Sequence, residues 1–121
     1  MSEKTKATVH AYWRGWITED FTAMRQALAD DVVADAALCR VEGADNYVAL
    51  CAEGAPWRDV VMIDEFYTDD HAAILYEGVN TGNNHRMRVA ELVQLADNKI
   101  TVIQSCLSPL TMLENAMKDG A

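Results

Sequence analysis

Alternation of side chains is most regular in residues 85–96, which read HRMRVAELVQLA. Successive side chains of a β-strand point to opposite faces, so a spacing of two divides this segment into two sets. The mainly apolar set is His85, Met87, Val89, Glu91, Val93 and Leu95. The other set is Arg86, Arg88, Ala90, Leu92, Gln94 and Ala96. The pattern predicts a long strand, which must curve if its apolar face is to stay covered.

Similar runs precede and follow this segment, separated by short stretches of turn-forming residues. They predict further strands at Asp59–Tyr67, His71–Asn80 and Lys99–Leu107. Such short connections favour antiparallel pairing between consecutive strands. The second half of the chain therefore reads as a four-stranded antiparallel meander.

Helical spacing governs residues 4–31. Apolar side chains recur at intervals of three and four over Lys4–Ile17, which predicts an amphipathic helix with a wide aromatic stripe that includes Tyr12 and Trp16. Asp20 is a typical N-cap residue. The spacing of Phe21, Met24, Ala27 and Leu28 after it predicts a second helix, which ends at Asp30-Asp31.

The segment between these helices and the meander mixes both spacings. A short strand is predicted at Val32–Leu38, with Ala34 and Ala36 on one face and Asp35 on the other. A third helix is predicted at Gly43–Gly54.

At the other end of the chain, Ser108-Pro109 predicts the start of a last short helix that carries Leu110, Leu113 and Met117 on one side. The order of elements predicts one α+β domain over residues 1–121. A curved, cone-shaped, mixed or antiparallel sheet would pack over the three helices of the first half and leave one small apolar pocket.

Composition excludes several classes of function. With 19 acidic and 10 basic side chains, the net charge of −9 disfavours binding to nucleic acids and to anionic membranes. No apolar stretch approaches the roughly 20 residues of a membrane helix, and no signal peptide is indicated, so we expect a cytoplasmic protein. The histidines and cysteines lack metal-ligand spacing, and no phosphate-binding glycine loop is present, so we expect neither metal nor cofactor. We expect Cys39, Cys51 and Cys106 to be free, buried thiols rather than catalytic ones.

Glu91 and Tyr12 are the residues most suited to chemistry. Glu91 falls on the apolar face of its strand, where burial would raise its pKa and prepare it as an acid, a base or a hydrogen-bond donor. Tyr12 brings a phenol to the aromatic stripe, and a tyrosine and a protonated carboxyl that converge on one oxygen form an oxyanion hole. The alternative is a structural role for both, with Glu91 hydrogen-bonded by a buried side chain or water and Tyr12 in the core.

Several short motifs together resemble one known family. They are Ala7–Tyr12, Asp20-Phe21, Ala29–Asp31, Gly43–Val48, Val89–Val93 and Asp97–Ile100. In order and spacing they are similar to ketosteroid isomerase-like and SnoaL-like proteins of the nuclear transport factor 2-like superfamily, over roughly residues 5–108. The resemblance implies a cone of helices and curved sheet that encloses small hydrophobic molecules and often dimerises through the sheet.

Carried over by position, Tyr12 matches the tyrosine that donates to the substrate oxygen in ketosteroid isomerases, and Glu91 matches its acidic partner. The carboxylate that shuttles the proton in that family falls at Ala36, and Asp35 beside it is directed to the opposite face. Ser105 stands at the acidic last-strand position of the related epoxide hydrolases. The resemblance therefore implies an oxygen-binding pair whose usual catalytic base is missing.

Two functions follow as expectations. The first is a pocket for a small, largely apolar, carbonyl-bearing or polycyclic metabolite, with cofactor-free isomerase, cyclase (as in polyketide cyclases) or dehydratase chemistry if the protein is an enzyme. The second is a non-catalytic ligand-binding or dimerisation module, which the alanine at position 36 favours. Besides Tyr12 and Glu91, the residues predicted to contact the ligand are Trp16, Trp57, Tyr76, Met87, Val89 and Ser105. Leu92 and Ala90 on the outer face predict a homodimer.

Overall fold

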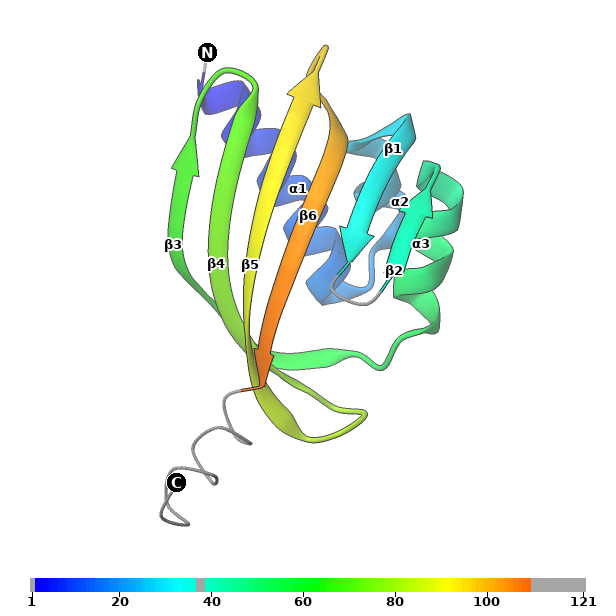
Figure 1. The fold of residues 1–121 in the computed structure, drawn as a ribbon, viewed down its shortest axis with the longest axis vertical. Helices are drawn as coiled ribbons and strands as arrows, with labels where there is room; N and C mark the ends of the chain where they lie inside the picture. Colours follow the sequence, from blue (N-terminus) through cyan, green and yellow to red (C-terminus); the bar gives the residue numbers. More distant parts are fainter. Residues whose placement is uncertain (1, 37–38, 110–121) are drawn as a thin grey trace.

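The computed structural model describes residues 2–36 and 39–109 and has the α+β architecture that the sequence predicts (Figure 1). Its helices are α1 (Ser2–Thr18), α2 (Phe21–Gln26) and α3 (Ala44–Glu53). Its strands are β1 (Leu28–Ala36), β2 (Cys39–Glu42), β3 (Trp57–Tyr67), β4 (His71–Asn80), β5 (His85–Ala96) and β6 (Lys99–Pro109).

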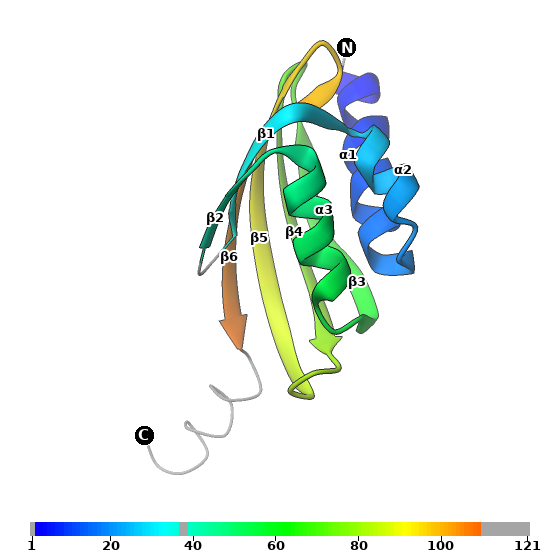
Figure 2. The same cartoon turned by 90° about the vertical axis from the view of Figure 1, so that its right-hand side faces the viewer.

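All six strands form one curved sheet in the order β2-β1-β6-β5-β4-β3. The predicted meander of β3 to β6 is antiparallel throughout, whereas β1 joins it by parallel pairing with β6. Asp97 and Asn98 connect β5 to β6 with φ angles of 50° and 59°, as a tight hairpin turn with two left-handed residues requires. Figure 2 shows that the three helices lie on one side of the sheet, so its inner face is covered and its outer face is not.

Two boundaries in the first half differ from the sequence-based prediction. Helix α2 ends at Gln26, and Leu28 opens strand β1 instead of closing the helix. Leu28 pairs with Ile100 of β6, and the amide of Ile100 donates to the carbonyl of Ala27 at 3.0 Å. Strand β2 was not predicted; its four residues pair with the end of β1 at the sheet edge.

The end of the described chain also differs. Strand β6 continues through Ser108 to Pro109, where we expected the last helix to begin. The remainder of that predicted helix lies outside the described residues. Strand β3 begins at Trp57, two residues before the predicted start at Asp59.

The hydrophobic core lies between the inner face of the sheet and the helices. Its most deeply buried members are Val9, Met24, Val32, Ala34, Val93, Ile100 and Ile103. Helix α1 crosses this core, as the predicted aromatic stripe requires, and Tyr12 and Trp13 are both buried. Burial of this stripe is the main attachment of α1, because removal of apolar surface from water is the dominant favourable contribution to folding.

Polar contacts fix the position of α1 along the sheet. The Thr5 hydroxyl donates to the carbonyl of Asp69 in the β3–β4 turn at 3.0 Å, and the Thr8 hydroxyl donates to Oδ1 of Asn98 in the β5–β6 turn at 2.9 Å. Near its other end, Gly15 allows close approach of α2, because a Cβ there would lie 2.8 Å from the Met24 amide nitrogen. Tyr12 projects from the length of helix between these attachments.

The cysteines are free, as predicted, but only Cys51 is partly buried. Cys39 and Cys106 are exposed, which corrects the expectation of three buried thiols. Cys39 lies on the edge strand β2, and Cys106 pairs with Ala90 on the uncovered outer face. A search of the described helices finds none with the length and apolar character needed to cross a membrane.

Candidate functional site

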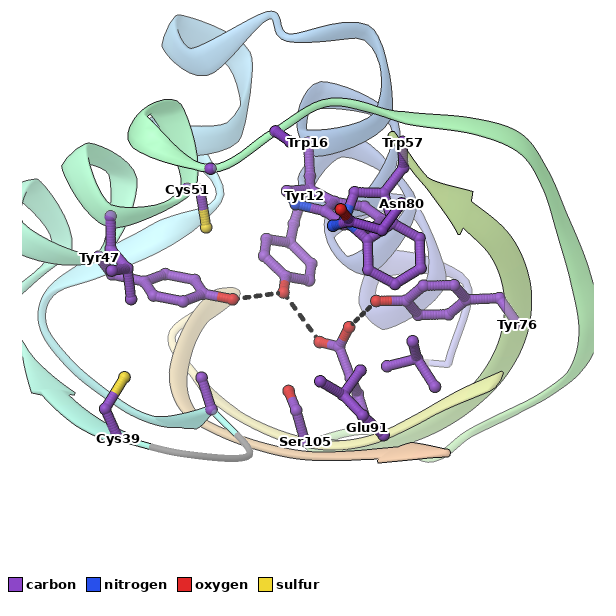
Figure 3. A pocket seen from close by; sticks show the side chains of 16 residues that line it. Tyr12, Trp16, Cys39, Tyr47, Cys51, Trp57, Tyr76, Asn80, Glu91 and Ser105 are labelled. Carbon is purple, nitrogen blue, oxygen red and sulfur yellow. Dashed lines mark hydrogen bonds between the residues drawn. The ribbon is translucent and has the colours of Figure 1, made fainter. Parts of the chain in front are cut away.

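A cavity of about 290 Å³ lies between α1, α3 and the inner face of the sheet. The predicted pair, Tyr12 and Glu91, lines it (Figure 3). Of the residues predicted to contact a ligand, the cavity wall includes Trp16, Trp57, Tyr76, Val89 and Ser105.

Met87 is the exception among the predicted residues, because it is not part of the described lining. Met87 is half-buried and pairs with Gly78 near the start of β5. A Cβ on Gly78 would lie 2.8 Å from the Val60 side chain and 3.1 Å from Trp57, so β3 side chains occupy the space above this part of the inner face. Strand periodicity gives the correct face for Met87, but it does not show where along the strand the cavity ends.

Glu91 lies at the centre of the site and is only 3% exposed. The Tyr12 hydroxyl donates to its Oε1 at 2.8 Å, and the Tyr76 hydroxyl donates to its Oε2. The Tyr47 and Tyr12 hydroxyl oxygens are 2.9 Å apart and share a further hydrogen bond. Figure 3 shows the four side chains in one connected row across the cavity, which we call the Tyr47–Tyr12–Glu91–Tyr76 chain.

Four different elements supply this chain of side chains. Glu91 comes from β5 and Tyr76 from the neighbouring strand β4, where Ile74 is the direct partner of Glu91. Tyr12 comes from α1 and Tyr47 from α3. The cluster therefore depends on the tertiary fold, because only the β4–β5 pair is fixed by strand register.

Tyr47 is the member that the sequence analysis did not single out. Its available signal was modest. Tyr47 and Ala44 lie on the buried side of α3. Tyr47 follows the N-cap residue of this helix, Gly43 (φ 91°), by one helical turn. A helix face of this kind predicts burial, but it does not predict that the hydroxyl will meet another tyrosine from α1.

Burial controls the electrostatics of the site. It raises the pKa of the Glu91 carboxyl above its ordinary value, although the hydrogen bonds from Tyr76 and Tyr12 act in the opposite direction. Burial, reinforced by the negative charge of Glu91, also raises the pKa of Tyr12, Tyr47 and Tyr76 well above the ordinary value. All three phenols therefore stay protonated at neutral pH, and the described lining contains no Lys, Arg or His to balance a charge on Glu91.

Aromatic rings form the wall on the α1 side. The ring centroid of Trp16 is 5.2 Å from that of Trp57 and 5.6 Å from that of Tyr76. Trp13 packs behind, with its ring edge-on to Tyr76 at 5.7 Å. Both tryptophans thus pack against the Tyr76 ring, so its hydroxyl is directed at Glu91 by packing as well as by hydrogen bonding.

The region around Ala36 has the geometry predicted for it. Ala36 lines the cavity, whereas the Asp35 carboxylate is directed away and pairs with the Arg40 guanidinium at 3.7 Å. The irregularity in the pairing of β1 with β6 lies between Leu28 and Val33, before this point, so it does not turn Asp35 inward. Within the described lining, Glu91 is the only carboxylate.

The arrangement can orient an oxygen and exchange a proton with it, but the described residues of the wall offer no second carboxylate to remove a proton from carbon. Among residues 2–36 and 39–109, no three His, Cys, Asp or Glu side chains are grouped so that they could hold a metal ion.

Comparison with known proteins places this geometry in a family. A candidate ketosteroid isomerase from Kribbella flavida superposes with a TM-score of 0.80 at 15% identity, over 88% of this chain and 79% of that one. An epoxide hydrolase of the LEH-like type from Mycobacterium tuberculosis gives 0.78 at 16% identity, over 97% and 92%. A nuclear transport factor 2-like protein of unknown function from Burkholderia xenovorans gives 0.79 at 17% identity, over 88% and 84%.

At these identities the structural likeness establishes the fold alone. No curated protein matches the chain significantly. The sequence model of the SnoaL-like domain, however, matches residues 9–103, which is most of the chain and includes every member of the Tyr47–Tyr12–Glu91–Tyr76 chain. The protein therefore belongs to the SnoaL-like family.

Proposed function

We propose that this protein binds a small, largely apolar molecule that carries a carbonyl oxygen, with that oxygen directed at the Tyr47–Tyr12–Glu91–Tyr76 chain. The observation that carries the proposal is a buried carboxyl group held by two tyrosines in a mainly aromatic and aliphatic cavity. Small-molecule sites commonly combine apolar walls with a few convergent polar groups and a titratable residue of perturbed pKa.

Size and charge narrow the ligand class. The cavity of about 290 Å³ is at the lower end of the range for small-molecule sites, roughly 300 to 1,000 Å³. A carboxylate or phosphate ligand would meet Glu91 without any described cation in the lining to neutralise it. A neutral molecule with one or two rings and one oxygen acceptor is therefore the class that we favour.

Acid–base catalysis, as an isomerase, cyclase or dehydratase, is the second candidate. It is supported by the pairing of Tyr12 with a buried acid and by structural neighbours that include a candidate ketosteroid isomerase and an epoxide hydrolase. The alanine at position 36 argues against it, because no carboxylate stands there to transfer a proton from carbon. We therefore place binding first.

Calorimetric titration with 1-indanone and with indane, its hydrocarbon counterpart, tests binding. We expect 1-indanone to bind about two- to tenfold more tightly, since a hydrogen bond to a buried donor contributes about 0.5 to 1.5 kcal/mol. Ala36→Leu should weaken the binding of both by filling the cavity, whereas Ala90→Leu, the same change on the outer face, should not. Equal affinity for the two compounds, or an affinity that Ala36→Leu leaves unchanged, would contradict the proposal.

Exchange of the C2 hydrogens of 1-indanone for deuterium in D₂O, followed by NMR, separates binding from catalysis. A binding protein without a base should leave the exchange rate at that of the buffer. Acceleration by the unmodified chain, lost when Tyr12 is changed to Phe, would establish the second candidate instead.

A further inference from the structure

The Tyr47–Tyr12–Glu91–Tyr76 chain contains four polar groups joined by three hydrogen bonds. When Glu91 is ionised it has no proton, so Tyr12 and Tyr76 must both donate to it. The single hydroxyl proton of Tyr12 is then used, and the bond between Tyr12 and Tyr47 must be donated by Tyr47. All three hydroxyl protons therefore point inward, and none remains for the oxygen of a ligand.

Protonation of Glu91 raises the number of O–H groups in the chain of side chains from three to four, whereas the number of internal hydrogen bonds stays at three. One arrangement has Glu91 donating to Tyr12 and Tyr12 donating to Tyr47, which releases the proton of Tyr47 to the cavity. Tyr47 stands at the open end of the row and is 6% exposed, compared with 3% for Tyr76 at the other end. The Tyr76 ring is also packed against Trp13 and Trp16. Tyr47 is thus the hydroxyl best placed to donate the released proton.

We propose that the site binds a neutral hydrogen-bond acceptor, such as a ketone, together with one proton taken up by Glu91, and that Tyr47 donates the hydrogen bond to the ligand. This inference rests on the proposed function, and it adds a proton to the binding reaction. It balances as one neutral ligand and one proton from solvent joining the ionised protein, with no covalent bond to the ligand made or broken.

The groups that face Glu91 are consistent with such coupling. They are Tyr12 from α1, Tyr47 and Cys51 from α3, Tyr76 from β4 and Ser105 from β6. Burial raises the pKa of the Cys51 thiol to about 11, so it stays neutral between pH 5 and 9, as the three phenols do. Of these groups, Glu91 is therefore the one whose charge can change when the ligand binds.

Ser105 provides the principal competing explanation. It lines the cavity beside Glu91, its partner on the neighbouring strand, and its hydroxyl could donate to a ketone whether or not Glu91 is protonated. A bond from Ser105 would give an affinity that does not vary with pH, whereas the proposed coupling gives an affinity that weakens by up to about tenfold for each pH unit above the pKa of Glu91. The pH dependence of affinity therefore distinguishes the two donors.

The experiment is calorimetric titration of the full chain with 1-indanone from pH 5 to 9, in buffers of different ionisation enthalpy. We expect uptake of up to one proton per ligand at the upper end of the range, and uptake that declines toward zero as the pH falls below the pKa of Glu91. Indane should bind without proton uptake at any pH. Glu91→Gln carries a permanent donor and no charge, so it should bind 1-indanone with a constant affinity and no proton uptake. Tyr47→Phe should lower the affinity for 1-indanone at pH 5 by a larger factor than Ser105→Ala does.

The results also distinguish a failure of this inference from a failure of the proposed function. Binding of 1-indanone with unchanged affinity from pH 5 to 9 and without proton uptake would overturn the inference and leave the proposed function standing. Affinity that increases with pH, or that is lost in Ser105→Ala but kept in Tyr47→Phe, would overturn it as well. Failure of 1-indanone to bind at every pH would instead overturn the proposed function.

Discussion

Replacement of Glu91 by glutamine should make the protein more stable at neutral pH, although it removes a central residue of the site. Glu91 is 3% exposed, so its ionised form has lost nearly all contact with water. A glutamine at this position would keep the size of the side chain, accept from one tyrosine and donate to the other. At pH 4 the two proteins should therefore differ by less than about 1.5 kcal/mol in their free energies of unfolding, the usual contribution of one hydrogen bond.

The sign of the effect follows from the direction of the pKa change. Burial raises the pKa of Glu91 in the folded state, so the folded protein holds this proton more tightly than the unfolded chain, where the pKa is about 4.3. The contribution of Glu91 to stability is fully present below about pH 4.3 and is lost as the pH rises through the folded pKa. Relative to the wild type, Glu91→Gln should gain about 1.4 kcal/mol for each unit by which the folded pKa is raised.

Urea unfolding from pH 4 to 8, followed by tryptophan fluorescence at one protein concentration, measures this gain. Asp30, Glu65 and Asp70 have lowered pKa values, so their contributions have the opposite sign, but they are common to both proteins and cancel in the difference. Glu53→Gln makes the same change at an exposed site and serves as the control. A flat curve for Glu91→Gln, or one that falls with pH, would refute the reasoning and would mean that the tyrosines stabilise the anion.

Three other changes test separate parts of the structure. Gly15→Ala should destabilise the protein by about 1 to 3 kcal/mol, because the new Cβ would lie 2.8 Å from the Met24 amide nitrogen. In the control Gly54→Ala the nearest contact would be at 3.5 Å, so the free energy of unfolding should change by less than about 1 kcal/mol. Equal melting temperatures for the two variants would contradict the crowding argument. Glu65→Gln removes a carboxylate that lies 2.7 Å from a His10 ring nitrogen, and because the Glu65 side chain is 30% exposed, the loss of stability at pH 7 should be about 1 kcal/mol or less. This loss should vanish as the pH falls through the lowered pKa of Glu65. A loss that persists at pH 3 would show that the hydrogen bonds of Glu65 matter rather than its charge. We also propose that the outer sheet face, where Leu92 is 58% exposed, pairs two copies of the chain: sedimentation should show a dimer that Leu92→Glu dissociates, and a wild-type monomer at micromolar concentration would contradict it.

Strand periodicity was sufficient to place the acidic half of the site. The alternation in residues 85–96 has one buried set, and Glu91 belongs to it because a strand offers only two faces. The same argument placed Asp35 away from the cavity and Ala36 within it. These predictions needed only the identity of the covered face, which the composition of the strand supplies.

Other features depended on contacts that no local pattern encodes. Leu28 continues the helical spacing of Met24 and Ala27, and it is buried. Both facts fit a helix as well as a strand, so only the pairing of Leu28 with Ile100 decides that it is a strand residue. Strand β2 is four residues long and bears Arg40 and Glu42 at an edge, which leaves little apolar alternation to detect. The role of Tyr47 arises where α3 meets α1, and the spacing within either helix does not specify that meeting.

The two threonine contacts of α1 link the position of the Tyr12 side chain to the two turns of the sheet that these threonines contact. Thr5 bonds to the β3–β4 turn and Thr8 to the β5–β6 turn, and Tyr12 follows Thr8 by one helical turn, about 6 Å along the axis. Surface turns normally accept insertions with little effect on neighbouring structure. Lengthening either of these turns would slide or tilt the helix and shift the Tyr12 hydroxyl relative to Glu91. Variation in hairpin length is therefore a route by which relatives with identical cavity residues can acquire different ligand preferences.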